Sequence, residues 1–406
     1  MKNNILVALF LFFNFGVYTS IGTSIGNIIV PNSLVILILI LLILYYHNFN
    51  RRFASSVSFL FMTVLLHSLI APVSIKDALL SSIQLISSIY AGYYYLKVLH
   101  DLGPKYVYKV MLFLAILILL GSALELLNTP VKQMSELFRF NYYGTMNFGL
   151  NYRELIHYGG ARPYFFTSEP SHIAKYFITI FMIIYSTSPR KAKNVILLLT
   201  LYIFSVIIIR SPLLLIIIAL VGGYEYFIAK SLKISSKISS VFLTGMIIFI
   251  STIYMGNRFD SIQTGRDVSY FIRIGSLDEI LLRTLKEYPL FGVGNGGKTM
   301  MESIVTDVYY DFGMMHSSIE GGNAERLANY LVVLILYFGL ITSTVIFYLF
   351  YKILKISYIP NWYFLMFSVL AYSFSEGGMV TARVWVYIYS IVYVSHVKST
   401  WKELSH

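Results

Sequence analysis

Gly256 to Arg326 is the largest polar stretch of the chain, and at its centre stands the run Phe291-Gly-Val-Gly-Asn-Gly-Gly297. The stretch is rich in arginine, and long apolar runs lie on both sides of it. Loops of this length are uncommon in compact folds and tend to be functional. We therefore expect the rest of the chain to hold this segment in place, and the segment to carry the chemistry.

The apolar sequence around this stretch indicates an all-α, polytopic integral membrane protein. Only 12% of the 406 residues are charged, whereas a soluble domain has about 25%. So few charges do not cover a soluble surface of this size. Membrane topology accounts for part of the net charge of +12, so no nucleic-acid partner is expected. The absence of cysteine excludes disulfides and thiolate metal sites.

Apolar runs of about 17–25 residues are long enough to span a bilayer. The N-terminal run resembles a signal peptide but lacks an Ala-x-Ala site, so we interpret it as a retained first span. We predict a single membrane domain, 1–406, of about twelve transmembrane helices: 4–22, 31–47, 54–71, 77–97, 107–127, 170–187, 194–209, 212–229, 239–255, 327–350, 360–377 and 380–397.

The lysines and arginines of the short loops predict the orientation, because they favour the cytoplasmic side. Sixteen of the 31 basic residues, 13 Lys and 3 Arg, fall on alternate loops, which places both termini in the cytoplasm. The other 15 are 5 Lys and 10 Arg. Arginine is preferred where a planar fork holds phosphate or carboxylate, although sequence drift or ordinary ion pairs give the same bias.

Two long loops then lie on the outer side, 128–168 and 256–326. Within the second, 270–288 predicts an amphipathic helix along the membrane surface, with Tyr270, Ile274, Leu277, Leu281, Leu285 and Tyr288 on its apolar face. The segment from Gly292 to Thr299 matches the phosphate-loop pattern, but no strand precedes it and it lies on the side without ATP, so we reject that interpretation. A flexible turn, or an anion site made of free amides, are the alternatives.

The phosphate-binding candidates are arginines of the outer loops: Arg162, Arg210, Arg266, Arg273, Arg283 and Arg326. Arg283 is four residues from both Glu279 and Glu287, so a helix salt bridge is its alternative role. Arg210 sits in the turn between two apolar spans, where a snorkelling interfacial arginine is the alternative.

The general-base candidates are Glu169, His316, Glu320 and Glu325, and the sequence does not rank them. Helix capping alone would explain Glu169, and a lone histidine in a polar loop is usually only solvated. Charges just inside a span, such as Lys175, are expected to face a wet interior. The short loop from Glu376 to Arg383 forms either a wall of the same cavity or a simple turn. No metal site and no cofactor are predicted.

Several of these motifs, in this order, resemble the O-antigen polymerase (Wzy) and O-antigen ligase superfamily of bacterial envelope glycosyltransferases. They are Arg162 before Pro-Tyr-Phe-Phe-Thr-Ser-Glu-Pro-Ser, Arg210 in a tight outer hairpin, Arg273 before Tyr288-Pro-Leu-Phe-Gly-Val-Gly-Asn-Gly, and Asn329-Tyr-Leu before Gly339. Arg283 and Gly294 also fit an R-x10-G spacing. The resemblance covers about residues 162–339.

The resemblance implies a helical fold like that of C-type glycosyltransferases, acting without metal in the bacterial inner membrane with its active site toward the periplasm. The donor and acceptor would be oligosaccharides linked to undecaprenyl diphosphate, with membrane lipids and a chain-length regulator protein as further partners. Ligases of the superfamily typically have a histidine where this chain has Ala328, which favours a polymerase. An O-antigen ligase acting on lipid A-core, or a flippase for lipid-linked oligosaccharides, are the alternatives.

Overall fold

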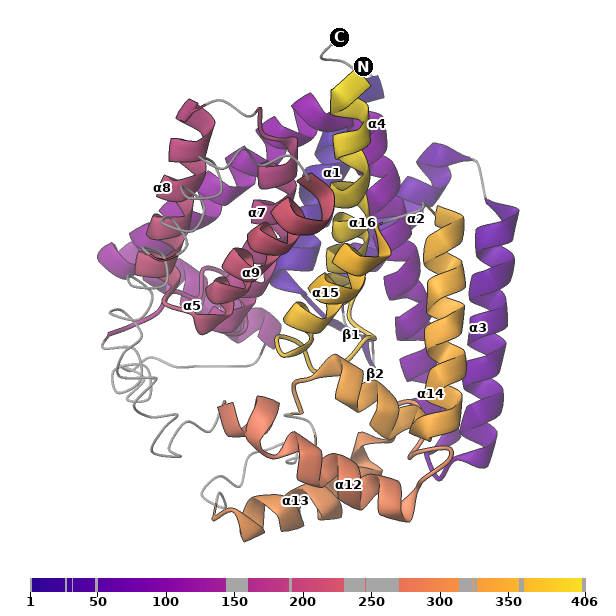
Figure 1. Cartoon of the computed structure of the whole chain (residues 1–406). Coiled ribbons are helices and arrows are strands. Elements are labelled where there is room, and N and C mark those ends of the chain that lie inside the picture. Colours follow the sequence, from indigo (N-terminus) through magenta and orange to yellow (C-terminus); the bar gives the residue numbers. More distant parts are fainter. Residues whose placement is uncertain are drawn as a thin grey trace.

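The computed structural model describes residues 2–25, 28–30, 32–47, 50–143, 160–189, 192–229, 245, 270–313, 324, 327–357 and 361–403. The described part consists almost entirely of helices, most of which run side by side as a bundle (Figure 1). Two short helices, α12 (Leu277–Glu287) and α13 (Glu302–Asp311), lie across one end of that bundle, at the bottom of Figure 1.

The first part of the bundle consists of α1 (Lys2–Thr19), α2 (Ser33–Tyr46), α3 (Arg51–Ile70), α4 (Ile75–Leu127) and α5 (Thr129–Tyr143). The second part consists of α7 (Pro170–Thr187), α8 (Ala192–Ile209), η1 (Pro212–Leu214), α9 (Leu215–Tyr224), η2 (Glu225–Ala229), η3 (Phe271–Gly275), η4 (Gly297–Met301), α14 (Tyr330–Ser357), α15 (Trp362–Ser373) and α16 (Ala382–Glu403).

Two three-residue strands depart from the all-α expectation. β1 (Thr23–Ile25) and β2 (Ile28–Val30) pair antiparallel, with Thr23 opposite Val30, in the turn between α1 and α2. The chain reverses direction there within a few residues, and the extended pairing satisfies backbone groups that a bare turn would leave open. The fold is otherwise helical, as predicted.

Eleven of the twelve predicted spans coincide with helices, and the ninth, 239–255, lies outside the described residues. Within the described residues, α3, α4 and α14 are long and apolar enough to cross a membrane by themselves. The shorter apolar helices cover 4–19, 33–46, 193–209, 212–228 and 362–373. The protein is therefore a helical membrane protein, while the count of twelve spans remains a prediction.

The fourth and fifth predicted spans form one element, α4. At about 1.5 Å per residue, its 53 residues would extend far beyond the roughly 30 Å of a hydrocarbon core. Gly103 interrupts it with a left-handed φ of 72°, and Pro104 follows. This break separates two arms, which matches the predicted turn near Lys97 to Lys109.

A second break, in α14, is where the glycine-rich loop docks. Gly339 has a φ of 64° and a ψ of −174° inside the helix. The freed backbone groups pair with the loop: Val293 N donates to Leu336 O at 3.0 Å, and Gly294 N donates to Tyr337 O at 2.8 Å. A Cβ on Gly292 would lie 2.5 Å from the Gly339 nitrogen, so the two backbones approach closely because neither residue has a side chain.

The helices α7 and α16 form the centre of the bundle, because nearly every side chain along them is buried. A helix that is apolar all round belongs in the interior. Gly92 of α4 allows α16 to approach, since a Cβ there would lie 2.4 Å from the Tyr389 ring and 2.8 Å from Trp385 O. Small residues at such crossings allow close backbone contact between membrane helices.

The loops predicted to lie on one side meet at one end of the bundle. Arg383 Nη2 donates to Ser20 Oγ at 2.6 Å, and a Cβ on Gly294 would lie 2.3 Å from Val73. At the opposite end, Asn361 Nδ2 donates to Phe227 O at 3.1 Å. The N-terminus and the C-terminus lie together at that opposite end, at the top of Figure 1, as an even number of spans requires.

The helix expected at 270–288 is present, but its buried face differs from the prediction. Its buried residues are Phe271, Leu277, Ile280 and Thr284, whereas Ile274, placed on the apolar face, is 43% exposed. The reason is η3, a single π-helical turn that adds a residue and shifts the register of everything before Ser276.

Candidate functional site

The N-terminal end of α7 presents a carboxylate, that of Glu169, to solvent. Glu169 is the residue preceding the helix, yet its side chain makes no capping hydrogen bond, so capping does not account for it. The side chain is exposed, and Ser171 Oγ donates to its Oε2 at 3.0 Å. The two hydroxyl residues before it bond elsewhere: Thr167 Oγ1 donates to Glu169 O at 2.8 Å, and Ser168 Oγ lies 3.0 Å from His172 Nδ1.

One turn further along α7, a buried ion network joins three segments. Glu376, in the loop between α15 and α16, receives Lys175 Nζ at 3.4 Å and Arg383 Nη1 at 2.9 Å. Side-chain exposure is 8% or less for all three, so the charges compensate one another away from bulk water. Tyr372 supports the network by stacking on Tyr387, with ring centroids 3.8 Å apart.

Arg273 connects the second outer loop to this network. It lies on η3, and its Nη1 donates to Phe374 O at 3.3 Å, at the end of α15. Its positive charge acts on Glu169, His172 and Lys175. The structure therefore brings together two residues that the sequence named separately, Arg273 and Glu169.

The environment of Glu169 keeps its carboxyl ionised. The loss of hydration next to the protein would by itself raise the pKa of this carboxyl. The Lys175 ammonium, the Ser171 hydroxyl and the Arg273 guanidinium outweigh that effect and lower the pKa below its usual value. Glu376, a like charge, works weakly in the opposite direction. Glu169 is therefore an ionised, solvent-accessible acceptor at neutral pH.

The described residues of this cluster include three cations, Lys175, Arg273 and Arg383, beside two carboxylates, Glu169 and Glu376. Guanidinium groups suit a phosphate because several donors lie in a rigid fork.

Arg162 lies on the segment that leads into Glu169, and Arg210 contacts the start of that segment. Arg210 occupies the turn between α8 and η1 with a left-handed φ of 50°, and its guanidinium lies against Gly160, where an added Cβ would be 2.3 Å from Nη1. Arg162 lies two residues after Gly160 and is half-buried. Arg210 thus contacts the last part of the first outer loop, 128–168.

Arg283 does not join this cluster. Its Nε lies 2.7 Å from Glu279 Oε1 and its Nη2 lies 2.7 Å from Asp311 Oδ2, so it links α12 to α13. These two carboxylates raise the pKa of the guanidinium. The salt-bridge alternative, with Asp311 in place of Glu287, describes it best. The remaining candidates lie outside the described residues: Arg266, Arg326, His316, Glu320 and Glu325.

Four backbone amides of the glycine-rich loop are used for hydrogen bonds within the protein. Besides the two bonds to α14, Gly292 N donates to Tyr288 O at 3.2 Å and Gly297 N donates to Gly294 O at 2.9 Å. Asn295 Oδ1 accepts from Ser81 Oγ at 3.1 Å, which fixes the loop against α4. The loop holds α12 and α13 to the bundle.

Three members of the cluster, Lys175, Glu376 and Arg383, were noted in the sequence but not assigned to the phosphate-binding or general-base candidates. Their position is the signal that drew attention to them, because charges within or at the edge of apolar spans are expensive and usually functional. Sequence spacing does not show that they meet, since Lys175 and Glu376 are about 200 residues apart.

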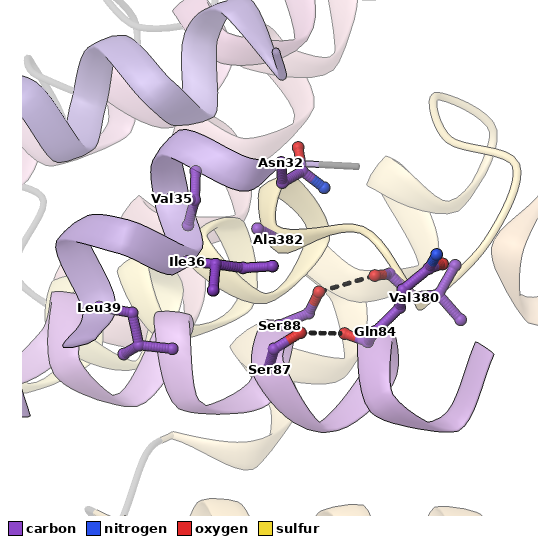
Figure 2. A pocket seen from close by; sticks show the side chains of 9 residues that line it. All are labelled: Asn32, Val35, Ile36, Leu39, Gln84, Ser87, Ser88, Val380 and Ala382. Atoms are coloured by element: carbon purple, nitrogen blue, oxygen red, sulfur yellow. Dashed lines mark hydrogen bonds between the residues drawn. The ribbon is translucent and has the colours of Figure 1, made fainter. Parts of the chain in front are cut away.

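Two small pockets lie beside this region. The first, between α2, α4 and the loop before α16, leaves about 10 Å³, roughly the room of one water molecule (Figure 2). Figure 2 shows Ser88 Oγ donating to Val380 O at 2.6 Å on its wall. The second, lined by α14 residues and Asn295, leaves about 20 Å³. Neither holds a sugar, so both are packing defects rather than substrate sites.

The family match below agrees with a helical membrane protein. Residues 4–396 match the family model described as WcaD colanic acid polymerase. No curated protein and no solved structure matches the chain. Because the match covers nearly the whole chain, the protein belongs to the WcaD colanic acid polymerase family, and it is a glycosyltransferase-type enzyme that polymerises polysaccharide repeat units.

Proposed function

We propose that the protein joins repeat units that are linked to undecaprenyl diphosphate, and that it does so at the end of the bundle that carries Glu169. The growing glycan is the donor, and the non-reducing sugar of a second lipid-linked unit is the acceptor. The observation that carries this proposal is the exposed carboxylate of Glu169, whose pKa is lowered by the neighbouring Lys175 ammonium, Ser171 hydroxyl and Arg273 guanidinium. A base and an anion site are the two features that this transfer needs.

The bond changes follow from that pairing. The acceptor hydroxyl oxygen forms a bond to the anomeric carbon of the donor, and the bond from that carbon to the diphosphate oxygen breaks. The hydroxyl proton passes to the carboxylate of Glu169, and undecaprenyl diphosphate leaves with the bonding electron pair. Carboxylates also act as proton acceptors in glycoside hydrolysis, which passes through an oxocarbenium-like transition state at the anomeric carbon.

The leaving diphosphate gains negative charge as the bond breaks, so fixed cations near it lower the barrier. Arg273 is assigned to this role because its charge already acts on Glu169. Arg210 and Arg162 are assigned to the same diphosphate because they lie on and against the segment that leads to Glu169. With guanidinium groups in this role, the reaction proceeds without a metal ion.

We assign this end of the bundle to the periplasmic side of the bacterial inner membrane. The support is charge: sixteen basic residues lie on the loops of the opposite side, which the positive-inside tendency places in the cytoplasm. Lipid-linked substrates reach the site from the bilayer. A chain-length regulator protein remains the expected partner, because nothing in the cluster measures the length of a polymer.

The test uses the full-length protein in nanodiscs and the lipid-linked repeat unit extracted from a strain that lacks the gene. We expect a ladder of products on a gel and release of undecaprenyl diphosphate. A single transfer to lipid A-core would instead identify a ligase, and movement of the unit across a vesicle without bond formation would identify a flippase. Glu169→Gln should abolish the ladder, and Glu287→Gln, at an exposed position at the end of α12, is the matched control.

A further inference from the structure

The segment just before Glu169 adopts a backbone conformation that its own residues disfavour. Phe165 has a φ of 32° and Phe166 a φ of 65°, two consecutive aromatic residues in the left-handed region. L-residues with bulky side chains avoid this region, so such a conformation persists only where the surroundings enforce it. What enforces it here lies on α4 and α5.

Glu125, in the last turn of α4, holds the turn through its carboxylate. Its Oε2 accepts from Tyr164 N at 3.1 Å and also from Phe165 N. The residue is only 5% exposed. Hydrogen bonds from backbone amides to a carboxylate are about twice as strong as neutral ones, and burial strengthens them further.

α5 completes the clamp from the other side. Ser135 Oγ accepts from Phe166 N at 3.1 Å, and the Arg139 guanidinium lies 3.6 Å from the centre of the Tyr164 ring. Both residues are buried. Gly121 of α4 makes room for the Phe165 ring, because a Cβ there would lie 1.9 Å from it.

The clamp is connected to the candidate base through one residue. Thr167 ends the turn, and its Oγ1 donates to the Glu169 carbonyl oxygen at 2.8 Å. A shift at Tyr164 or Phe165 would therefore move the start of α7, and with it the Glu169 carboxylate. A buried carboxylate is costly unless it is hydrogen-bonded, and Glu125 accepts from two backbone amides of this turn.

We propose that Glu125 is a positioning residue for the polymerisation reaction: it fixes the Tyr164–Phe166 turn and so aims Glu169 at the acceptor hydroxyl. This inference rests on the proposed role of Glu169 as base. The geometric part, a carboxylate that locks two amides, stands independently of that role. The experiment therefore measures the two parts separately.

The geometric part is measured by hydrogen exchange on the full-length protein in nanodiscs. Glu125→Gln keeps the size of the side chain but replaces the accepting charge. We expect the amides of Tyr164 and Phe165 to exchange about 10- to 100-fold faster, the ratio that corresponds to a lost charge-assisted bond. Exchange in the 277–287 peptide should not change. Ser135→Ala, which removes the acceptor for Phe166 N alone, is a milder second variant.

The functional part is measured with the extracted lipid-linked repeat unit. We expect kcat to fall at least about 10-fold in Glu125→Gln with KM within about threefold, because the base is misplaced while substrate binding remains. Glu287→Gln, at an exposed position at the end of α12, should behave as wild type in kcat and in exchange at Tyr164 and Phe165. If exchange at Tyr164 and Phe165 is unchanged, or if it rises while kcat stays the same, the positioning role of Glu125 is overturned. An active Glu169→Gln variant would instead overturn the proposed base.

Discussion

The guanidinium of Arg210 lies against the α-carbon of Gly160, so that a Cβ added to Gly160 would stand 2.3 Å from Nη1. Gly160 has no left-handed φ, and the contact is with the far end of a flexible side chain, so Gly160→Ala should fold normally while displacing the guanidinium. We expect polymerisation to fall about 10-fold or more, because shifts of about 1 Å at a catalytic site have effects of this size. Gel analysis of the glycan ladder measures it.

Gly222→Ala is the matched control, since a Cβ at Gly222 meets nothing within 4 Å. It should leave activity unchanged and thermal unfolding the same or slightly higher, because alanine favours a helix. Full polymerisation by Gly160→Ala would mean that the position of the Arg210 guanidinium is unimportant.

The dependence of rate on pH should reveal Glu169. Its pKa is lowered, so the carboxylate is ionised at neutral pH, and the rate should be lost only as the pH falls through a value below the ordinary 4.5. Arg273→Gln removes one of the charges that lower this pKa, so the acidic limb of the kcat profile should move to higher pH. Arg283→Gln, paired with Glu279 and Asp311 elsewhere, should leave the limb in place.

If the acidic limb of the kcat profile is the same in Arg273→Gln, in Arg283→Gln and in the wild type, the charge of Arg273 does not act on Glu169, which contradicts their joint role. The two arginines differ in one respect that matters here: the charge of Arg273 acts on Glu169, whereas Arg283 bridges α12 and α13.

Glu376→Gln should destabilise the bundle strongly. It removes the anion between Lys175 and Arg383, and both cations are buried. Breaking a buried pair in this way typically costs about 3–5 kcal/mol, because a buried charge is left uncompensated. Thermal unfolding in detergent measures the loss. Glu279→Gln breaks a half-exposed pair on α12 and should cost under about 1 kcal/mol; equal losses for both variants would contradict the assignment.

Gly339→Ala should disrupt the docking of the glycine-rich loop. The φ of 64° disfavours alanine, and the new Cβ would lie 2.4 Å from the backbone of Leu290, which has no freedom to move aside. We expect a loss of about 3 kcal/mol or more in stability. Gly313→Ala is the control: the φ of 68° strains the backbone, but the added Cβ meets nothing within 4 Å, so the variant should lose only about 1 kcal/mol of stability. Similar unfolding temperatures for the two variants would show that the contact with Leu290 is not tight.

The positions of most helices could be predicted from the sequence, because they depend on hydrophobic composition. Apolar runs of fixed length predicted most of the helices, and the alternation of lysines agrees with the termini lying at one end (Figure 1). Prediction was weakest where register matters. The π-helical turn at Phe271–Gly275 has no sequence signature, so Ile274, which precedes Ser276, was wrongly placed on the buried face. The two strands β1 and β2 were likewise not foreseen.

For the site, the sequence pointed to Glu169 and Arg273 as residue types suited to the chemistry, but it treated Lys175 and Glu376 as marginal. A span looks the same in sequence whether its charge faces lipid, water or a partner, because both faces of these helices are apolar. The partner of Lys175 lies about 200 residues away, and no local pattern encodes that distance.

By itself, the sequence determined that the chain is a helical membrane protein, because hydrophobicity acts residue by residue. The tertiary structure alone decided which charges meet. Ion pairing and backbone docking depend on contacts between distant segments: Glu376 with Lys175, Gly160 with Arg210, and the glycine-rich loop in the break at Gly339.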